Sequence, residues 1–355
     1  MRVVVIGASG NIGTSVLAAL ERDDAVTSVL AVARRPAEDA APKVEWRARD
    51  ITRDDLRADL EGADAVVCLA WLIQPSRDRD ATLATNVEGS RRVFEAAAAA
   101  GVPALLYSSS VGAYSPGPKD RAVDESWPTG GIETSFYSRD KAEVERILDG
   151  VEARHGGMRV VRMRPALVFK REAASEIRRL FAGPLLPSPL VRRSLIPFAP
   201  RSRRLRFQAV HSLDVGEAFR LAVHADVRGA FNLAAEPVLD GDELGRLLDA
   251  RPIAVHPGLL RAAVNVTWRL RLQPSPPGWI DLALGVPIMS SARAREELGW
   301  TPRHSAADAL LELLAGLRDR AGADTPTLES GAGGRFRAGE LATGVGAEQW
   351  PPRRR

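Results

Sequence analysis

The 355-residue chain predicts an α/β fold in which a doubly wound parallel sheet is followed by a smaller C-terminal substrate lobe. Three observations predict it. Short β-branched runs alternate with helical patterns over residues 1–165, a glycine-rich turn joins the first run to the first helix, and the alternation breaks after Pro165. Such alternation indicates a parallel sheet with helices on both faces. We therefore expect a first domain over 1–165, to which segments near 207–235 return, and a second lobe over 166–320.

The elements of the first domain follow from hydrophobic patterning and from capping residues. Short apolar runs predict strands, and longer amphipathic stretches with an N-cap or a terminal glycine predict helices. The expected strands are Val3–Ile6, Val29–Ala33, Val44–Arg47, Ala65–Ala70, Ala104–Tyr107 and Arg159–Met163. The expected helices are Asn11–Asp23, Thr52–Leu60, Asp80–Ala100 and Phe136–His155.

The region after Pro165 has no long period and is rich in proline and arginine up to residue 206, which predicts an irregular lobe. From residue 321 the chain is rich in Gly, Ala, Thr and Pro, so we expect 321–355 to be a disordered tail. Between residues 206 and 321 we expect strands at Phe207–Val210 and Gly229–Leu233. In the same region we expect helices at Leu213–His224, 240–250, 258–270, 291–298 and 305–319.

Composition excludes several classes of protein. The 49 basic residues are nearly balanced by 45 acidic ones, which is not the profile of a dedicated nucleic-acid binder. No run of 18 apolar residues predicts a membrane helix, and no signal peptide is expected. The single cysteine, Cys68, excludes a disulfide framework and fits a reducing cytoplasm. The five histidines lack metal-ligand spacing, so we expect no metal site.

A glycine loop follows the first strand directly and opens the first helix. Its first glycine permits a tight turn, its second lets a phosphate approach the backbone, and its third lets the helix pack on the strand. The free N–H groups and partial positive charge of the helix N-terminus suit a pyrophosphate. This context predicts a dinucleotide site of the Rossmann type, with contacts from Gly7, Ser9, Gly10, Asn11, Ile12 and Gly13.

The end of the second strand bears on the choice of dinucleotide. NAD sites usually place a carboxylate there for the ribose 2′-hydroxyl, but here the strand is followed by Arg34 and Arg35. Arginine can bind a 2′-phosphate through two hydrogen bonds. The sequence therefore favours NADP over NAD and leaves NAD open, because an acid can be supplied from elsewhere.

A serine run and a Tyr–Lys pair supply candidate catalytic groups. Tyr137 and Lys141 share one face at the start of a predicted helix. A lysine ammonium beside a tyrosine hydroxyl is expected to lower the tyrosine pKa and to make it a competent acid or base. Ser110 ends a run that follows the fifth strand, at the sheet edge where doubly wound folds bind ligands.

Together these motifs resemble the extended short-chain dehydrogenases/reductases, and among them the NAD-dependent epimerase/dehydratase family. The resemblance runs in order over about residues 1–310. It rests further on Asp50-Ile51, on Asn86-Val87-Glu88-Gly89, on Arg164-Pro165, on Val210-His211 before Asp214-Val215, and on Leu298-Gly299-Trp300-Thr301-Pro302.

The resemblance implies a role for each matching residue. Tyr137 would be the acid/base, and Lys141 would bind the nicotinamide ribose and tune Tyr137. Ser110, with Ser109 as the alternative, would hydrogen-bond the substrate oxygen. Asp50 would contact the adenine amino group beside Ile51. The other residues expected to line the cofactor are Leu69, Ala70, Trp71, Ser108, Pro165 and Val168.

Some features depart from that family or leave alternatives open. Sugar-nucleotide epimerases usually carry an asparagine beside the proline that follows the sixth strand, and the run Arg164-Pro165-Ala166-Leu167-Val168 has none, which weakens a nucleotide-sugar substrate. Arginines between 171 and 206 could form a basic mouth or be scattered surface residues. A reductase, an epimerase and a dehydratase all remain open, acting on a small molecule. So do a non-catalytic NADP(H) sensor on the same fold and an adaptor that uses the basic tail. The resemblance also implies that helices 80–100 and 136–155 can form a homodimer interface.

Overall fold

The computed structural model describes residues 1–38, 41–186, 188, 191, 195–331 and 345. Within this part, the central sheet has seven parallel strands in the order β3-β2-β1-β4-β5-β7-β11. The order reverses at β1, as it does in dinucleotide-binding doubly wound sheets, so the predicted fold class is confirmed. The strands are β1 (Arg2–Ile6), β2 (Ser28–Ala33), β3 (Val44–Ala48), β4 (Ala65–Cys68), β5 (Ala104–Ser108), β7 (Arg159–Pro165) and β11 (Gly229–Leu233).

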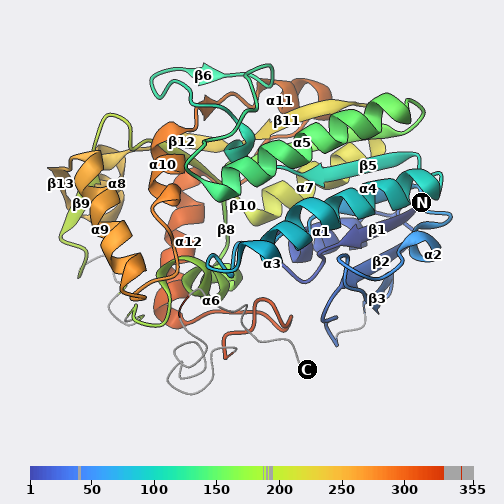
Figure 1. The fold of residues 1–355 in the computed structure, drawn as a ribbon, viewed down its shortest axis with the longest axis horizontal. Helices are drawn as coiled ribbons and strands as arrows, with labels where there is room; N and C mark the ends of the chain where they lie inside the picture. Colours follow the sequence, from blue (N-terminus) through green and yellow to red (C-terminus); the bar gives the residue numbers. More distant parts are fainter. Residues whose placement is uncertain (39–40, 187, 189–190, 192–194, 332–344, 346–355) are drawn as a thin grey trace.

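Helices cover both faces of this sheet (Figure 1). Alternate residues of β1 separate the two cores: Val3 and Val5 pack on one side, and Val4 and Ile6 on the other. The first core is closed by α1 (Asn11–Glu21), α7 (Ser212–His224) and α11 (Ala292–Leu298). The second is closed by α2 (Arg57–Leu60), α4 (Ser90–Ala99) and α5 (Phe136–Arg154).

The second lobe lies at the left of Figure 1, beyond the carboxyl ends of the central strands. It contains three small sheets, β12-β10-β8, β13-β9 and β14-β6. Their strands are β6 (Ala122–Val123), β8 (Leu167–Phe169), β9 (Phe198–Arg201), β10 (Phe207–His211), β12 (Ala235–Leu239), β13 (Arg251–Ala254) and β14 (Ile288–Met289). Its helices are α6 (Ala174–Ile177), α8 (Gly241–Leu248), α9 (Pro257–Arg269), α10 (Gly278–Gly285) and α12 (Ala306–Asp319). No helix among the described residues is long and apolar enough to cross a bilayer.

The helix expected over Thr52–Leu60 is reduced to its last four residues, Arg57–Leu60. The side chains before it bond to nearby backbone instead. The Asp50 carboxylate accepts from the Thr52 N–H and hydroxyl, and the Asp54 carboxylate accepts from the Asp50 N–H. Short polar side chains compete in this way with helix formation.

The helix expected over Asp80–Ala100 is interrupted. It consists of α3 (Arg79–Leu83), a π-helical segment over Ala84–Gly89, and α4. Asn86 in the π-helical segment bonds both backbone groups of Leu72, accepting from the N–H at 2.7 Å and donating to the carbonyl at 2.8 Å. The segment thus anchors the loop that follows β4.

Part of the region expected to be a disordered tail is described. Residues 321–331 pack against the body of the protein, and Leu328 is fully buried. The rest of that region, 332–344 and 346–355, lies outside the described residues.

Candidate active site

The glycine loop connects β1 to α1 and touches the ends of two neighbouring strands. Gly7 donates its N–H to the Val32 carbonyl of β2, and it has a φ of +85° that favours glycine. A Cβ on Gly7 would stand 2.6 Å from the Ala70 nitrogen, and one on Gly13 would stand 2.4 Å from the Gly7 oxygen. At Gly10 the nearest atom would be 3.6 Å away. The loop is therefore tightly packed at both ends and open in the middle.

The predicted arginines directly follow β2, beside this loop. Arg35 is partly buried, and burial lowers its pKa, while the Glu329 carboxylate acts in the opposite direction. The structure thus brings Arg35 near a carboxylate from the far end of the chain. Arg34 is also partly buried.

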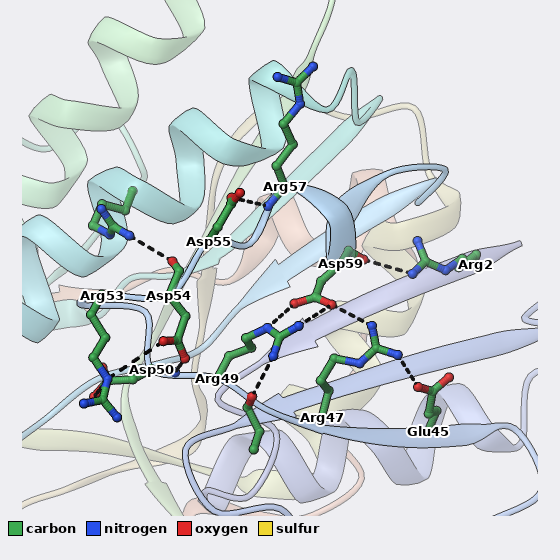
Figure 2. A network of polar contacts seen from close by, with 12 residues as sticks. Arg2, Glu45, Arg47, Arg49, Asp50, Arg53, Asp54, Asp55, Arg57 and Asp59 are labelled. Atoms are coloured by element: carbon green, nitrogen blue, oxygen red, sulfur yellow. Dashed lines mark hydrogen bonds and ion pairs between the residues drawn. The ribbon is translucent and has the colours of Figure 1, made fainter.

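Asp50 and Ile51 lie beyond the end of β3. The Asp50 carboxylate accepts from the Thr52 hydroxyl at 2.7 Å, and Ile51 is buried in the core against Gly89. Figure 2 shows Asp50 beside a network in which the Asp59 carboxylate forms ion pairs with Arg47 and Arg49. That network ties β3 to α2 and is structural.

Tyr137 lies in the first turn of α5, and Ser110 follows β5. The Ser110 hydroxyl and the Tyr137 ring both lie beside Gly112, and the Ser110 hydroxyl accepts the Gly112 N–H at 3.0 Å. Burial raises the pKa of Tyr137 to about 12, although the Ser110 hydroxyl acts to lower it. The phenol is therefore protonated at neutral pH, and burial by itself makes it a weaker acid than a free tyrosine.

Lys141 is buried one turn further along α5, but it does not act on Tyr137 as the sequence led us to expect. Its ammonium donates to the Ser108 carbonyl at 2.7 Å and to the Tyr107 hydroxyl at 3.2 Å. It also lies 3.5 Å from the centre of the Trp71 ring, but 6.0 Å from that of Tyr137. Burial lowers the Lys141 pKa to about 7. The expected lowering of the Tyr137 pKa is thus absent, because Trp71 and backbone oxygen hold the ammonium.

An aromatic wall surrounds Tyr137, and the sequence analysis identified only part of it. We define this wall as Trp71, Phe136, Phe181 and Trp279. The Trp71 ring meets the Tyr137 ring edge-on at 5.7 Å, and the Trp279 ring lies 4.9 Å from it. Phe181 packs on Trp279 at 4.8 Å. No motif marks Trp279 or Phe181 in the sequence, because α10 and the segment after α6 have no recognisable pattern.

Ser109, the alternative to Ser110, belongs to a buried polar network. Its hydroxyl donates to Glu145 at 2.5 Å, and Glu145 pairs with Arg164. Arg164 also donates to the Tyr114 hydroxyl at 3.0 Å, and that hydroxyl donates to Asn232. Ser109 and Arg164 are therefore bound within the interior network, whereas Ser110 lies beside Gly112 together with Tyr137.

The remaining predicted residues fall at the same sheet edge. Leu69 donates its N–H to the Ile6 carbonyl, and Asn11 donates its side-chain amide to the Val168 carbonyl at 3.0 Å. Pro165 ends β7. A residue that was not predicted, the buried Lys170, donates to the Asn11 carbonyl at 3.0 Å and to the Thr14 hydroxyl at 2.5 Å.

Several of the arginines between 171 and 206 bond to backbone carbonyls. Arg178 donates to Gly183, Arg179 to Thr327 and Glu329, Arg204 to Leu284, and Arg206 to Lys119. Arg192 and Arg193 lie outside the described residues.

The residues present fit a dinucleotide. No side chain caps α1 at Gly10, and the loop is open on that side, as a phosphate requires. Two buried polar atoms of this edge, Asn11 Oδ1 and Trp71 Nε1, have no hydrogen-bond partner among the described residues. A polar ligand would satisfy such atoms.

Comparison with known proteins identifies the class. The model of the NAD dependent epimerase/dehydratase family matches residues 3–234, and the chain belongs to this family. It is accordingly an NAD-dependent oxidoreductase of the epimerase/dehydratase type.

Two curated relatives are similar over most of the chain. A 3-beta-hydroxysteroid dehydrogenase of Mycolicibacterium neoaurum is 26% identical over 342 residues, covering 88% of this chain and 90% of the relative. A 3 beta-hydroxysteroid dehydrogenase/Delta 5-->4-isomerase of Mycobacterium tuberculosis (strain CDC 1551 / Oshkosh) is 26% identical and covers 88% of this chain and 89% of its own.

Among solved structures, the UDP-glucose 4-epimerase of Thermus thermophilus in complex with NAD has a TM-score of 0.65 at 20% identity. The match covers 90% of this chain and 99% of that one. At this identity the likeness supports the fold alone.

Proposed function

We propose that the protein is a dehydrogenase that interconverts a secondary alcohol and a ketone on a bulky apolar substrate. The observation that carries this proposal is the position of Tyr137, a proton donor set between Trp71 and Trp279 of the aromatic wall. A flat, apolar substrate would pack on these rings through a large contact area.

The chain's own side chains supply the proton chemistry. Tyr137 would give its proton to the ketone oxygen or take one from the alcohol, and Ser110 would hydrogen-bond the same oxygen and polarise it. Lys141, once released from Trp71, would place a positive charge beside the phenol and favour its ionised form. The nicotinamide of a bound dinucleotide would supply or accept the hydride.

The aromatic wall and the curated relatives point to the same class of substrate. The curated relatives are named for 3β-hydroxysteroids, which are flat apolar alcohols. A nucleotide sugar would need polar partners, but the family's usual asparagine is missing beside Pro165, and the neighbouring Arg164 is paired with Glu145. These points favour a steroid-like alcohol over a nucleotide sugar.

For the cofactor, we propose a nicotinamide dinucleotide bound along the glycine loop, with NADP(H) favoured. Arg34 and Arg35 follow β2 where a 2′-phosphate would lie. Glu329 near Arg35 opposes this preference and leaves NAD(H) as the alternative.

Two further points remain proposals. A homodimer would use the outer surfaces of α4 and α5, which pack against each other on one face of the sheet. A cytoplasmic location fits the single free thiol, Cys68. Light scattering after size exclusion would test the dimer.

The test is an absorbance assay at the nicotinamide band with NAD or NADP and a panel of alcohols. We expect turnover with a 3β-hydroxysteroid and none with UDP-glucose. Conversion of UDP-glucose to UDP-galactose without net change in absorbance would replace the proposal by an epimerase. Failure to bind either dinucleotide would overturn it altogether.

A further inference from the structure

A segment near the C-terminus crosses the edge of the sheet where the dinucleotide is proposed to bind. We call residues 321–331, which follow α12, the strap. In Figure 1 the strap runs from the lower end of α12 back toward the central sheet. Its Leu328 is fully buried and its Thr325 nearly so. The strap is thus packed onto the protein, although its sequence is that of a tail.

On one side the strap holds the glycine loop through a single residue, Ser9. The Thr325 hydroxyl donates to the Ser9 carbonyl at 2.8 Å, and the Thr327 and Ser9 hydroxyls lie 3.0 Å apart. Ser9 is left only 8% exposed. Both bonds involve the loop that would hold the pyrophosphate.

On the other side the strap is held by the substrate lobe. Arg179, just after α6, donates to the Thr327 carbonyl at 2.5 Å and to the Glu329 carbonyl at 3.0 Å. The Ser175 N–H of α6 donates to the Ala321 carbonyl at 3.2 Å. The strap therefore joins α6 of the substrate lobe to the glycine loop of the sheet domain.

The strap also reaches the residue that we expect at the adenosine ribose. Burial lowers the pKa of Arg35, and the Glu329 carboxylate lies near enough to act against that lowering. Ser9 and Arg35 mark the two sides of the adenosine end of a Rossmann site, the loop and the end of the second strand. The strap contacts the first and places a charge beside the second.

We propose that the strap is a clasp over the adenosine end of the dinucleotide site, which must open to let the cofactor in or out. Closed, it retains the cofactor by bridging the two lobes across it. This inference rests on the proposed function, because it assumes that a dinucleotide lies along the glycine loop. The closed clasp makes cofactor exchange slow, so its opening limits the turnover of a dehydrogenase, which must exchange its cofactor in each cycle.

A disulfide lock tests the clasp directly. The Ser9 and Thr327 hydroxyl oxygens lie 3.0 Å apart, so the double variant Ser9→Cys/Thr327→Cys places two thiols side by side for oxidation to a disulfide. The native Cys68 is fully buried and would not interfere. The full-length variant is loaded with NADH or NADPH while reduced, and half is then oxidised. Dissociation is followed by the loss of dinucleotide fluorescence after excess oxidised cofactor is added.

We expect dissociation to slow at least about tenfold in the oxidised protein and to recover on reduction. Equal rates in the two states, with the disulfide verified by mass spectrometry, would overturn the clasp. So would failure of the disulfide to form. If the unmodified protein binds neither NADH nor NADPH, the proposed function fails and the clasp fails with it.

Two variants open the clasp instead. Ending the chain after Arg320 removes the strap, and Thr325→Val removes one of its hydrogen bonds while keeping Leu328. We expect dissociation to rise roughly tenfold in the first and a few-fold in the second, since the second loses one hydrogen bond of the strap. The control is Thr301→Val, on an exposed threonine between α11 and α12, which should leave the rate unchanged. If the truncated chain does not fold, Thr325→Val decides, and an unchanged rate there counts against the clasp.

Discussion

The two ends of the proposed cofactor site are built in different ways. At the glycine-loop end, backbone atoms define the site: Gly7 and Gly13 leave no space for a side chain, and Gly10 leaves the middle open. At the catalytic end, side chains from distant segments define it, with Trp71, Tyr137 and Trp279 in contact. Backbone geometry can serve any dinucleotide, whereas side chains can be exchanged to suit a substrate. We therefore expect the first end to be generic and the second to carry specificity.

The largest effect is expected at the catalytic end. Tyr137→Phe should lower kcat by about 10²- to 10⁴-fold, the usual loss for a general acid, while dinucleotide binding stays intact. Tyr114→Phe is the matched control, because its buried hydroxyl bonds Asn232 and Arg164 away from the site. Steady-state rates and fluorescence titration measure the two effects. A Tyr137→Phe protein with full activity would remove the catalytic role.

At the other end, two glycines should respond oppositely to the same substitution. Gly13→Ala should lower the free energy of unfolding by about 3 kcal/mol, because its Cβ would stand 2.4 Å from the Gly7 oxygen. Gly10→Ala should change stability by about 1 kcal/mol or less, but weaken dinucleotide binding by roughly tenfold or more, because the methyl group faces the phosphate. Urea titration and binding titration separate the two. Equal stability losses would show that the loop is only a packed turn.

Each end also holds a buried lysine with a lowered pKa, about 7 for Lys141 and about 8 for Lys170. Burial is the first cause in both. Between these values and the ordinary lysine pKa, the unfolded chain binds more protons than the folded one, so stability should rise with pH from about 7 to 10. The slope per group is at most about 1.4 kcal/mol per pH unit.

Lys141→Met and Lys170→Met should each flatten that rise, and Lys141→Met should do so from a lower pH. Urea unfolding at pH 7, 8 and 9 checks this. Stability that falls over this range in the parent protein would contradict the charge-burial argument.

A smaller effect should come from the wall. Trp279→Leu should raise KM for an apolar alcohol by about tenfold, since less apolar area is buried, with dinucleotide affinity unchanged. Leu259→Ala on α9, an exposed apolar residue, is the control. A change in dinucleotide affinity instead would place Trp279 at the generic end.

The smallest effect concerns Glu329. Glu329→Gln should raise the affinity for NADPH relative to NADH by about threefold, because it removes a negative charge near Arg35. The effect is small because Glu329 is exposed and screened by solvent. Competition titrations in low salt measure it, and an unchanged ratio would place Arg35 away from the 2′-phosphate.

The sequence predicted the backbone-defined end well and the other end in part. Gly7, Gly10 and Gly13 are recognisable because their roles are local: a turn, a close approach and a helix contact within seven residues. Tyr137 and Lys141 have a helical spacing, so their position at the start of α5 also followed. Their electrostatics did not, because Trp71 holds the Lys141 ammonium, and a cation–π contact leaves no sequence pattern.

The remaining site residues depend on tertiary packing between distant segments. Trp279 lies in α10, a helix that the sequence did not indicate, and Thr325 and Thr327 lie in a segment whose composition predicts disorder. No sequence pattern in α10 indicates that Trp279 packs against Tyr137, and none in residues 321–331 indicates that the two threonines bond to Ser9. Helix Thr52–Leu60 was wrong in extent for a local reason, the Asp50–Thr52 hydrogen bonds, which compete with helix formation.

The lone thiol of β4 has a use that does not depend on any ligand. Cys68 is fully buried in the central sheet, and burial raises its pKa to about 12. In the folded protein a thiol reagent therefore cannot reach the sulfur, and the sulfur is not in its reactive thiolate form. The rate of Cys68 alkylation therefore measures how often the central sheet opens transiently. Because the sequence has no second cysteine to contribute to the signal, Cys68 is a built-in probe for the opening of the core.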